Sequence, residues 1–452
     1  MYRDAEIRVQ EWIDNSKKAL LIYGARQVGK TWLIREMLGR NRIPYFEVNL
    51  LERQDILNRL NTVHDAGEMI DLLKLYSPQP LEDRKAVVFL DEIQVYPDIL
   101  TKIKFMVDDG RLRYILSGSN LGIELKGLHS APIGYVEQWQ MFPMTLYEFS
   151  LALGAKQDTL AHLKECYEQR KPVDEVIHRQ MIRSFYTYLM TGGMPAVVET
   201  LVKQSNLSAV DAEQKNIINQ YKADFIKYEA ENRRLKIISV YDSIPSQLNK
   251  QNRRFVFTYL NKELKFDRYE ESFLWLKDAA VAIPVFNAQA PVLPLEQSRS
   301  SNLFKLYQSD VGLLTACYPA QLRQEIMQMN PDTEINFGSL FENYVACEMY
   351  ANGLKMLYYK SVEIGEIDYL LELDGRLMPL EVKSGKDYRR HKALDHLLSS
   401  TKFNVNRAIV LSLNNTEQDG NILYLPIYMA PLLHNSIPTS NTMDIGFFNR
   451  AE

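Results

Sequence analysis

A chain of 452 residues is too long for one ordinary hydrophobic core, so its length predicts two or three domains. The 46% hydrophobic and 24% charged residues are typical of a globular protein, and no apolar run is long enough to span a membrane. The beginning of the chain lacks the apolar core of a signal peptide, which predicts a cytoplasmic location. A net charge of −4 does not indicate nucleic-acid binding by the whole chain, and the three separated cysteines indicate neither disulfides nor zinc.

The first segment with a chemical signature begins at Ala19. Ala19 to Tyr23 form an apolar run with the length of a buried strand, and a glycine-rich loop follows it directly. The loop reads Gly24, Ala25, Arg26, Gln27, Val28, Gly29, Lys30, Thr31. This is the spacing of a P-loop, in which backbone N–H groups surround a polyphosphate such as that of ATP. Lys30 would reach the β- and γ-phosphates, and the Thr31 hydroxyl would ligate Mg²⁺.

The next signature is a pair of acids at the end of an apolar strand. After a second strand at Tyr45 to Asn49 and a helical stretch, the run from Ala86 ends in Asp91 and Glu92. This is typical of a Walker B strand, in which Asp91 holds Mg²⁺ and Glu92 orients and deprotonates the water that attacks the γ-phosphate. An acid directly after Asp91 favours water as the nucleophile over the acceptor of a nucleotide kinase.

A strand from Tyr114 also ends in small polar residues. In an ATPase with an additional strand, a polar group at this position senses the γ-phosphate, which makes Ser119 the first candidate and Asn120 the second. A simple strand-terminating turn explains the same two residues. We expect the last strand of the sheet at Gly134 to Trp139.

Several motifs together resemble a known group of proteins. Gly-Ala-Arg-Gln-Val-Gly-Lys-Thr, Phe-Leu-Asp-Glu-Ile-Gln, Ser-Gly-Ser-Asn and Phe-Pro-Met-Thr-Leu-Tyr-Glu-Phe look like those of the AAA-type ATPases of bacteria and archaea that carry a C-terminal domain of unknown function. Two departures concern the site: Tyr135 stands where that group commonly has an arginine, and His129 and Ser130 replace a different pairing. These departures predict either slow hydrolysis or a transition-state arginine from elsewhere, for example from a second copy of the chain in a homo-oligomer.

A later motif of the same group, Gly192-Gly193-Met194-Pro195, has two readings. The resemblance implies a lid that closes over the nucleotide, whereas the residues alone favour a tight turn between helices.

The middle segment shows helical spacing, then short helices and a pair of strands at Val281 to Phe286 and Phe304 to Tyr307. Three helices and a strand pair predict a winged helix, which the resemblance also implies. From Glu231 to Glu270 nine basic residues stand against five acids, which allows contact with DNA phosphates but is also typical of a solvated face.

The third segment carries a second set of acids. Glu342 lies on a predicted helix, Asp368 on a strand, and Glu381 and Lys383 on one face of the next strand. This arrangement resembles the PD-(D/E)XK nucleases. The resemblance implies that Glu342, Asp368 and Glu381 bind Mg²⁺ or Mn²⁺ and that Lys383 stabilises the phosphate or helps to activate the water.

The sequence therefore predicts an α/β protein with an AAA-type ATPase domain and helical lid (1–200), a helical and winged-helix domain (201–330), a PD-(D/E)XK nuclease-like domain (331–435) and a mobile tail (436–452). The predicted function is ATP hydrolysis coupled to a domain that acts on or binds DNA. The alternative is a nucleotide-dependent signalling or scaffold switch whose C-terminal domain is an inactive binding module.

Overall fold

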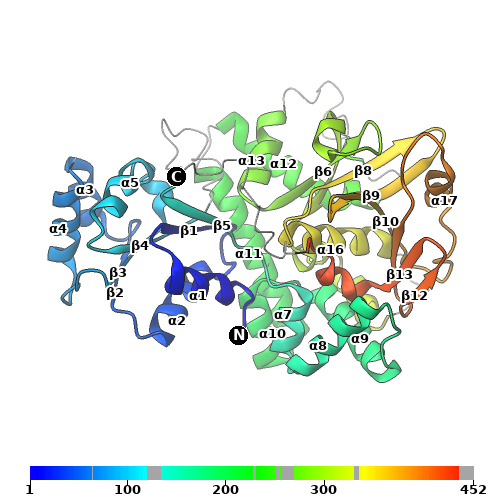
Figure 1. The fold of residues 1–452 in the computed structure, drawn as a ribbon, viewed down its shortest axis with the longest axis horizontal. Coiled ribbons are helices and arrows are strands. Elements are labelled where there is room, and N and C mark those ends of the chain that lie inside the picture. The colour runs from blue at the N-terminus through cyan, green and yellow to red at the C-terminus, as the bar shows by residue number, and fades with distance from the viewer. Residues whose placement is uncertain are drawn as a thin grey trace, which may run out of the picture.

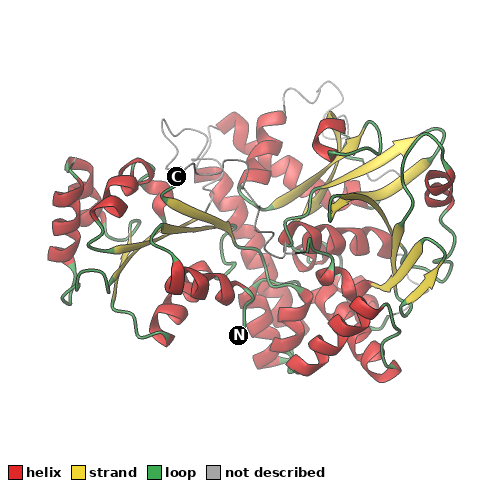
Figure 2. Cartoon of the chain, in the orientation of Figure 1, coloured by secondary structure: helices red, strands yellow, loops and turns green. Residues whose placement is uncertain are grey.

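The computed structural model describes residues 1–63, 65–119, 134–227, 231–250, 254–256, 269–329 and 335–436. Within these residues the chain forms two β-sheets toward opposite ends of the molecule, with helices between and below them in the view shown (Figures 1 and 2). The predictions for Asn120, His129, Ser130 and the tail from residue 437 lie outside the described residues.

The first sheet, at the left of Figure 1, is parallel throughout. Its strands are β1 (Ala19–Tyr23), β2 (Tyr45–Asn49), β3 (Val87–Asp91), β4 (Arg113–Gly118) and β5 (Val136–Gln140). They lie in the order β2-β3-β4-β1-β5. Strand β4 thus separates the strand before the glycine-rich loop from the strand that ends in acids, which confirms the predicted additional-strand core.

Helices cover both faces of this sheet, which is why β1 is apolar without alternation. Leu20 and Ile22 belong to the same buried cluster as apolar residues of α1 (Ala5–Asn15) and α2 (Lys30–Arg40). Ala19 and Leu21 face the other cluster. That cluster includes residues of α3 (Gln54–Thr62), α4 (Ala66–Tyr76), the short helix η1 (Ile93–Val95) and α5 (Ile99–Asp109). The loops at the carboxyl ends of the strands are therefore held by packing on both sides.

Helices of the middle of the chain connect the two sheets. They are α7 (Leu146–Ala152), α8 (Gln157–Gln169), α9 (Glu175–Thr191), α10 (Pro195–Gln204), α11 (Leu207–Lys227), α12 (Glu231–Leu248), α13 (Glu270–Asp278), α14 (Val311–Thr315) and α15 (Ala320–Met327). Helix α10 crosses the predicted boundary at residue 200, and one buried apolar cluster contains residues from Ala5 to Leu433. The three predicted segments are thus packed against one another.

The second sheet is mixed and lies at the right of Figure 1. Its strands are β6 (Ala282–Ala288), β7 (Arg299–Gln308), β8 (Met356–Ser361), β9 (Gly365–Leu373), β10 (Arg376–Val382), β11 (Ala408–Ser412), β12 (Glu417–Asp419) and β13 (Ile422–Pro426). Their order is β12-β13-β11-β10-β9-β8-β6-β7, and the sheet is accompanied by α16 (Phe337–Ala351), α17 (Lys392–Ser399), η5 (Leu295–Ser298) and η6 (Ile427–Leu432).

Strands β6 and β7 correct one expectation. We predicted them as the wing of a separate domain, but β6 pairs in parallel with β8, so both strands extend the C-terminal sheet. Phe286 of β6 stands opposite Leu357 of β8. The hydrophobic pattern predicts that these segments are strands, but it does not say which sheet they join.

A close backbone contact, which we call the glycine junction, joins the two halves. It consists of Gly192 and Gly193 between α9 and α10, Met144 after β5, and the segment from Asp310 to Gly312 at the start of α14. The Met144 N–H donates to the Gly193 carbonyl over 2.7 Å, and the Gly193 N–H donates to Asp310 Oδ2 over 2.6 Å. A Cβ on Gly193 would lie 2.0 Å from the Met144 carbonyl oxygen, so only glycine fits there.

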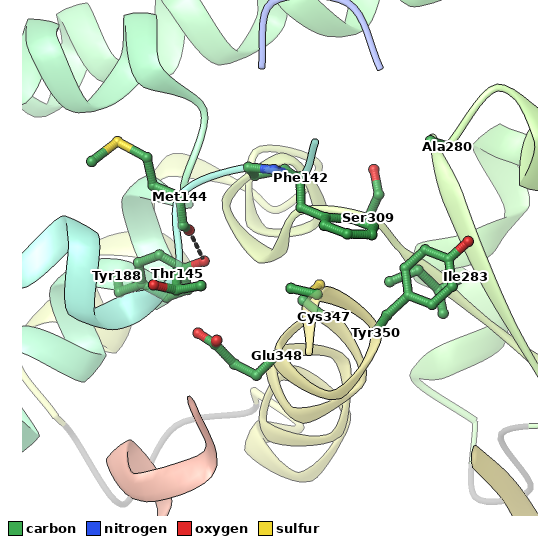
Figure 3. A pocket seen from close by; sticks show the side chains of 12 residues that line it. Phe142, Met144, Thr145, Tyr188, Ala280, Ile283, Ser309, Cys347, Glu348 and Tyr350 are labelled. Atoms are coloured by element: carbon green, nitrogen blue, oxygen red, sulfur yellow. Dashed lines mark hydrogen bonds between the residues drawn. The ribbon is translucent and has the colours of Figure 1, made fainter. Parts of the chain in front are cut away.

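A second contact between the halves lies beside the junction. Glu348 of α16 accepts the Leu146 N–H at the start of α7 over 2.9 Å, and burial raises the pKa of Glu348 to about 8. Figure 3 shows Glu348, Cys347 and Tyr350 of α16 facing Phe142, Met144 and Thr145. The cavity that these residues line has a volume of about 20 Å³. That volume holds little more than one water molecule, so this cavity is a packing gap and not a nucleotide site.

The junction generates a stability prediction. Gly193→Ala should lower the free energy of unfolding by about 3 kcal/mol, because the new methyl group overlaps a backbone oxygen that has little room to move. Gly39→Ala in α2 is the matched control: its Cβ would meet nothing within 4 Å, and we expect up to about 1 kcal/mol of added stability. Urea-unfolding midpoints measure both effects. Equal midpoints for the two variants would contradict the close contact at the junction.

Candidate nucleotide site and second acidic site

The glycine-rich loop lies between β1 and α2, as predicted. Gly24 has a φ of +149°, and a Cβ there would lie 2.2 Å from the Met141 carbonyl oxygen, so the loop leaves the strand through a position that requires glycine. Lys30 begins α2 and is 8% exposed. Its ammonium donates to the carbonyls of Gly24 at 3.1 Å and Ala25 at 2.9 Å.

Burial lowers the pKa of Lys30 to about 8, against the opposing effect of the Glu92 and Asp91 carboxylates. The two carbonyls that hold its ammonium are neutral acceptors. A phosphate oxygen is charged and forms the stronger hydrogen bond. Lys30 is thus placed to exchange backbone partners for a phosphate.

The residues at the ends of β3 and β4 meet at Asp91. The Thr31 hydroxyl donates to Asp91 Oδ2 over 2.8 Å, and the Ser117 hydroxyl donates to Asp91 Oδ1. Asp91 is 4% exposed. Thr31 and Asp91 therefore offer a hydroxyl and a carboxylate oxygen side by side, which are ligand types that Mg²⁺ prefers.

Glu92 is held beside this pair in a constrained position. Its φ is +59°, which is uncommon outside glycine, and its carboxylate accepts a hydrogen bond from the Gln94 amide. Gln94 also contacts Ser119 Oγ at 3.4 Å. Ser119, our first sensor candidate, therefore lies beside the Glu92–Gln94 pair, whereas Ser117 contacts Asp91 directly.

Sequence reasoning missed Ser117 and Gln94. Ser117 and Ser119 are both buried, and they lie two residues apart on a strand that ends between them. A pattern that says only that small polar residues end a strand cannot distinguish the two. Alternation along β4 puts both serines on one face, so no sequence signal separates them. The register of β4 against β3, in which Leu90 pairs with Leu116, is what sets Ser117 beside Asp91.

The tip of the loop contacts α11. The Arg26 guanidinium lies 2.6 Å from Asp224 Oδ2, the Gln27 amide donates to Gln220 over 2.5 Å, and the Tyr221 hydroxyl donates to the Arg26 carbonyl over 3.2 Å. Val28 is buried, and its carbonyl accepts from Arg3 over 2.9 Å. The loop is thus fixed between the beginning of the chain and a helix of the middle segment.

A mostly apolar cleft of about 500 Å³ opens beside the loop. It lies between the loop, the start of the chain and α10, which begins with the proline of the Gly192–Pro195 motif. Both readings of that motif are compatible with this position, since it forms the turn between α9 and α10 and borders the cleft. The lining residues are Met1, Arg3, Gln27, Gly29, Trp32, Met144, Pro195, Ala196, Glu199, Val202 and Lys203.

In the second sheet, the structure brings the predicted acids together but gives them protein partners. Glu342 of α16 is fully buried, and its Oε2 accepts from the Tyr307 hydroxyl at 2.9 Å. Asp368 Oδ2 accepts the Val382 N–H at 2.9 Å, and Glu381 Oε1 accepts from Lys383 at 2.8 Å. Burial, with the nearby charge of Asp368, raises the pKa of Glu381 to about 7.

Sequence reasoning also missed Lys305 of β7. Its buried ammonium lies 3.3 Å from Glu342 Oε2, 2.9 Å from Glu366 Oε1 and 4.0 Å from Asp368 Oδ1. Within the described residues, no group of three or more His, Cys, Asp or Glu side chains is arranged to hold a metal ion. The Lys305 ammonium lies between Glu342 and Asp368, and metal binding by Glu342, Asp368 and Glu381 stays a prediction.

The predicted basic surface of the middle segment is only partly described. Arg253, Lys262, Lys265 and Arg268 lie outside the described residues, and Arg233 is paired with Glu271 over 2.5 Å. The DNA contact stays a prediction.

The first sheet lies in a part of the chain that matches a known protein family. Residues 16–150 match a family described as an AAA domain. Residues 182–324 and 337–429 match two domains of unknown function, DUF8612 and DUF4143. A search of curated proteins found no match.

Solved structures with similar chains include three proteins of low identity. A Walker-type ATPase of Pyrococcus abyssi is 15% identical at a TM-score of 0.41, covering 70% of this chain and 95% of that one. The ORC1 protein of Aeropyrum pernix in complex with DNA is 12% identical at 0.31, covering 73% and 93%. AMPPCP-bound DnaA from Aquifex aeolicus is 10% identical at 0.30, covering 62% and 89%.

Three findings define the class of protein: the match to the AAA domain family, the strand order of the first sheet, and the glycine-rich loop between β1 and α2. The chain contains an AAA-type P-loop ATPase core, which confirms that part of the predicted resemblance. As for membranes, the helices in the described ranges are each too short or too polar to cross a bilayer.

The contacts of Asp91 generate a prediction that separates the two serines. Ser117→Ala should lower kcat for ATP hydrolysis about tenfold to a hundredfold, because a hydrogen bond to a buried carboxylate is worth about 1.5–3 kcal/mol. Ser119→Ala is the matched control and should change kcat less, because its contact with Gln94 is long. Steady-state phosphate release, with ATP affinity measured separately, gives both values. A larger loss for Ser119→Ala would restore our first assignment of the sensor.

Proposed function

We propose that this protein binds and hydrolyses ATP and uses the nucleotide to change the contact between its P-loop and α11. The observation that carries the proposal is the convergence of Lys30, Thr31, Asp91 and Glu92 at the carboxyl ends of two buried parallel strands. Parallel sheets bind ligands at this edge.

The binding step is supported by the loop and the cleft. Backbone N–H groups of residues 24–31 and the start of α2 would hold the phosphates, with Lys30 on the β- and γ-phosphates. The apolar cleft beside Trp32 and Pro195 has the size and character to take the nucleoside. Thr31 and Asp91 would hold Mg²⁺, which when bound neutralises phosphate charge.

The hydrolysis step would be carried by Glu92. Its carboxylate would orient the attacking water and accept its proton. In the structure this carboxylate is bonded to Gln94, so Glu92 would have to exchange the Gln94 amide for water before it acts. Ser117 would keep Asp91 oriented during this exchange.

Coupling to the rest of the chain would begin at the loop tip. Phosphate binding would draw Lys30 away from the carbonyls of Gly24 and Ala25, which directly precede the two residues that contact α11. Helix α11 also reaches the glycine junction, where Gln214 donates to the carbonyls of Met190, Thr191 and Gly312. A change at the P-loop would therefore be transmitted toward the second sheet.

For the second sheet we propose a nuclease-like binding module. The order α16–β8–β9–β10–α17–β11, with β10 and β11 parallel, supports the PD-(D/E)XK-like fold. The contacts of Lys305 favour the inactive alternative, in which nucleotide switches assembly or binding. We retain the basic residues of α12 as a candidate surface for DNA contact. Metal-dependent cleavage remains a second candidate because Glu381 Oε2, although buried, has no hydrogen-bond partner among the described residues.

Two substitutions test the ATPase proposal. Lys30→Ala should abolish ATP binding, because it removes the cation on the phosphates. Glu92→Gln should keep binding while lowering kcat by about 10²- to 10⁴-fold, because it removes the general base but preserves the side-chain shape. Trp32 is 44% exposed and lines the cleft, so its fluorescence should report binding.

The matched control is Trp32→Phe, which should remove the fluorescence change but not ATP turnover. ATP hydrolysis that survives Glu92→Gln unchanged would contradict the assigned role of Glu92. Wild-type protein that binds no ATP would contradict the whole proposal.

A further inference from the structure

The acidic site of the second sheet contains a lysine from a distant part of the chain. Lys305 lies on β7, is 1% exposed, and directs its ammonium at carboxylates of α16 and β9. Strand β7 falls in the region that matches one domain of unknown function, and α16 and β9 fall in the region that matches the next. The site is therefore assembled from two regions of the chain.

Three carboxylates surround the ammonium of Lys305, and one of them, Glu366, is also paired with Lys360 over 2.7 Å. Glu366 approaches it at 2.9 Å and Glu342 at 3.3 Å, with Asp368 at 4.0 Å. The ammonium is buried, and these ion pairs supply the opposite charge without which a buried cation would be strongly destabilising.

Most of the other acidic side chains of the site also accept hydrogen bonds from groups of the protein. Asp368 accepts the Val382 N–H, Glu381 accepts from Lys383, and Glu342 accepts from Tyr307. A divalent ion that bridged Glu342 and Asp368 would have to displace Lys305 or lie within a few ångströms of its charge.

We propose that Lys305 is the resident cation of this site, occupying the position between Glu342, Glu366 and Asp368 and excluding a divalent metal from it. The site holds its carboxylates together without a metal, and it fixes β7 to the C-terminal sheet. This inference concerns the proposed binding module and does not depend on ATP hydrolysis, so the two can fail separately.

Binding of Mn²⁺ to the full-length protein without nucleotide tests the proposal. Electron paramagnetic resonance measures free Mn²⁺, and Lys30→Ala in the background limits any contribution from the P-loop. Protein with Lys305 intact should show no Mn²⁺ binding that Asp368→Asn removes. Lys305→Met should gain one site at least tenfold tighter than any weak binding before, because it removes a charge while keeping an unbranched side chain. Adding Asp368→Asn to Lys305→Met should remove the gained site.

Three outcomes would overturn the proposal. One is a Mn²⁺ site in protein with Lys305 intact that Asp368→Asn abolishes, which would instead support metal binding at Asp368 and Glu381. Another is a folded Lys305→Met variant that gains no Mn²⁺ site. The third is plasmid cleavage with Mn²⁺ that both Asp368→Asn and Lys383→Ala abolish. Circular dichroism reports folding, and if Lys305→Met does not fold, the comparison of Asp368→Asn with the protein that retains Asp368 still decides.

Discussion

The two hydrogen bonds of the Gly193 backbone, to the Met144 backbone and to the Asp310 carboxylate, are the constraint on which the arrangement of the two sheets depends. The amide and carbonyl of this residue are both used, one on Asp310 and one on Met144, and there is no room for a side chain. Met144 follows β5, an edge strand of the first sheet, while Asp310 follows β7, an edge strand of the second sheet. Because both segments meet one glycine, neither sheet can shift there without breaking a buried hydrogen bond.

Two buried lysine ammonium groups, those of Lys30 and Lys305, have different kinds of partner. The Lys30 ammonium is held by neutral carbonyls, and burial lowers its pKa, so a charged phosphate oxygen can compete for it. The Lys305 ammonium is held by the carboxylates of Glu342 and Glu366, and charged partners are much harder to displace than neutral ones. The first environment suits an exchangeable ligand, and the second suits a permanent structural cation.

The ATPase core could be predicted from the sequence because its signals are local. An apolar strand, a glycine-rich loop and an acid-terminated strand each occupy fewer than about ten consecutive residues, and β1 and β2 have the predicted bounds. The helix of Glu342 and the strands of Asp368 and Glu381 were predicted for the same reason.

What the sequence did not reveal depends on contacts between distant segments. Lys305 lies 37 residues before Glu342 and on a strand that we assigned to another domain, so no spacing rule connects the two. The partner of β6 and the helix that contacts Arg26 are likewise decided by tertiary packing. Ser117 was missed for a smaller reason, a difference of two positions along one strand face.

In the proposed mechanism, nucleotide bound at the P-loop changes the contact between the loop and α11. Hydrogen–deuterium exchange of the segment containing Gln220, Tyr221 and Asp224, measured with and without ATP, tests it most directly. Glu92→Gln keeps the nucleotide intact during labelling, and Lys30→Ala is the control without binding. We predict that ATP changes the exchange of this segment in Glu92→Gln but not in Lys30→Ala. Unchanged exchange in Glu92→Gln, with ATP binding demonstrated by Trp32 fluorescence, would contradict the account.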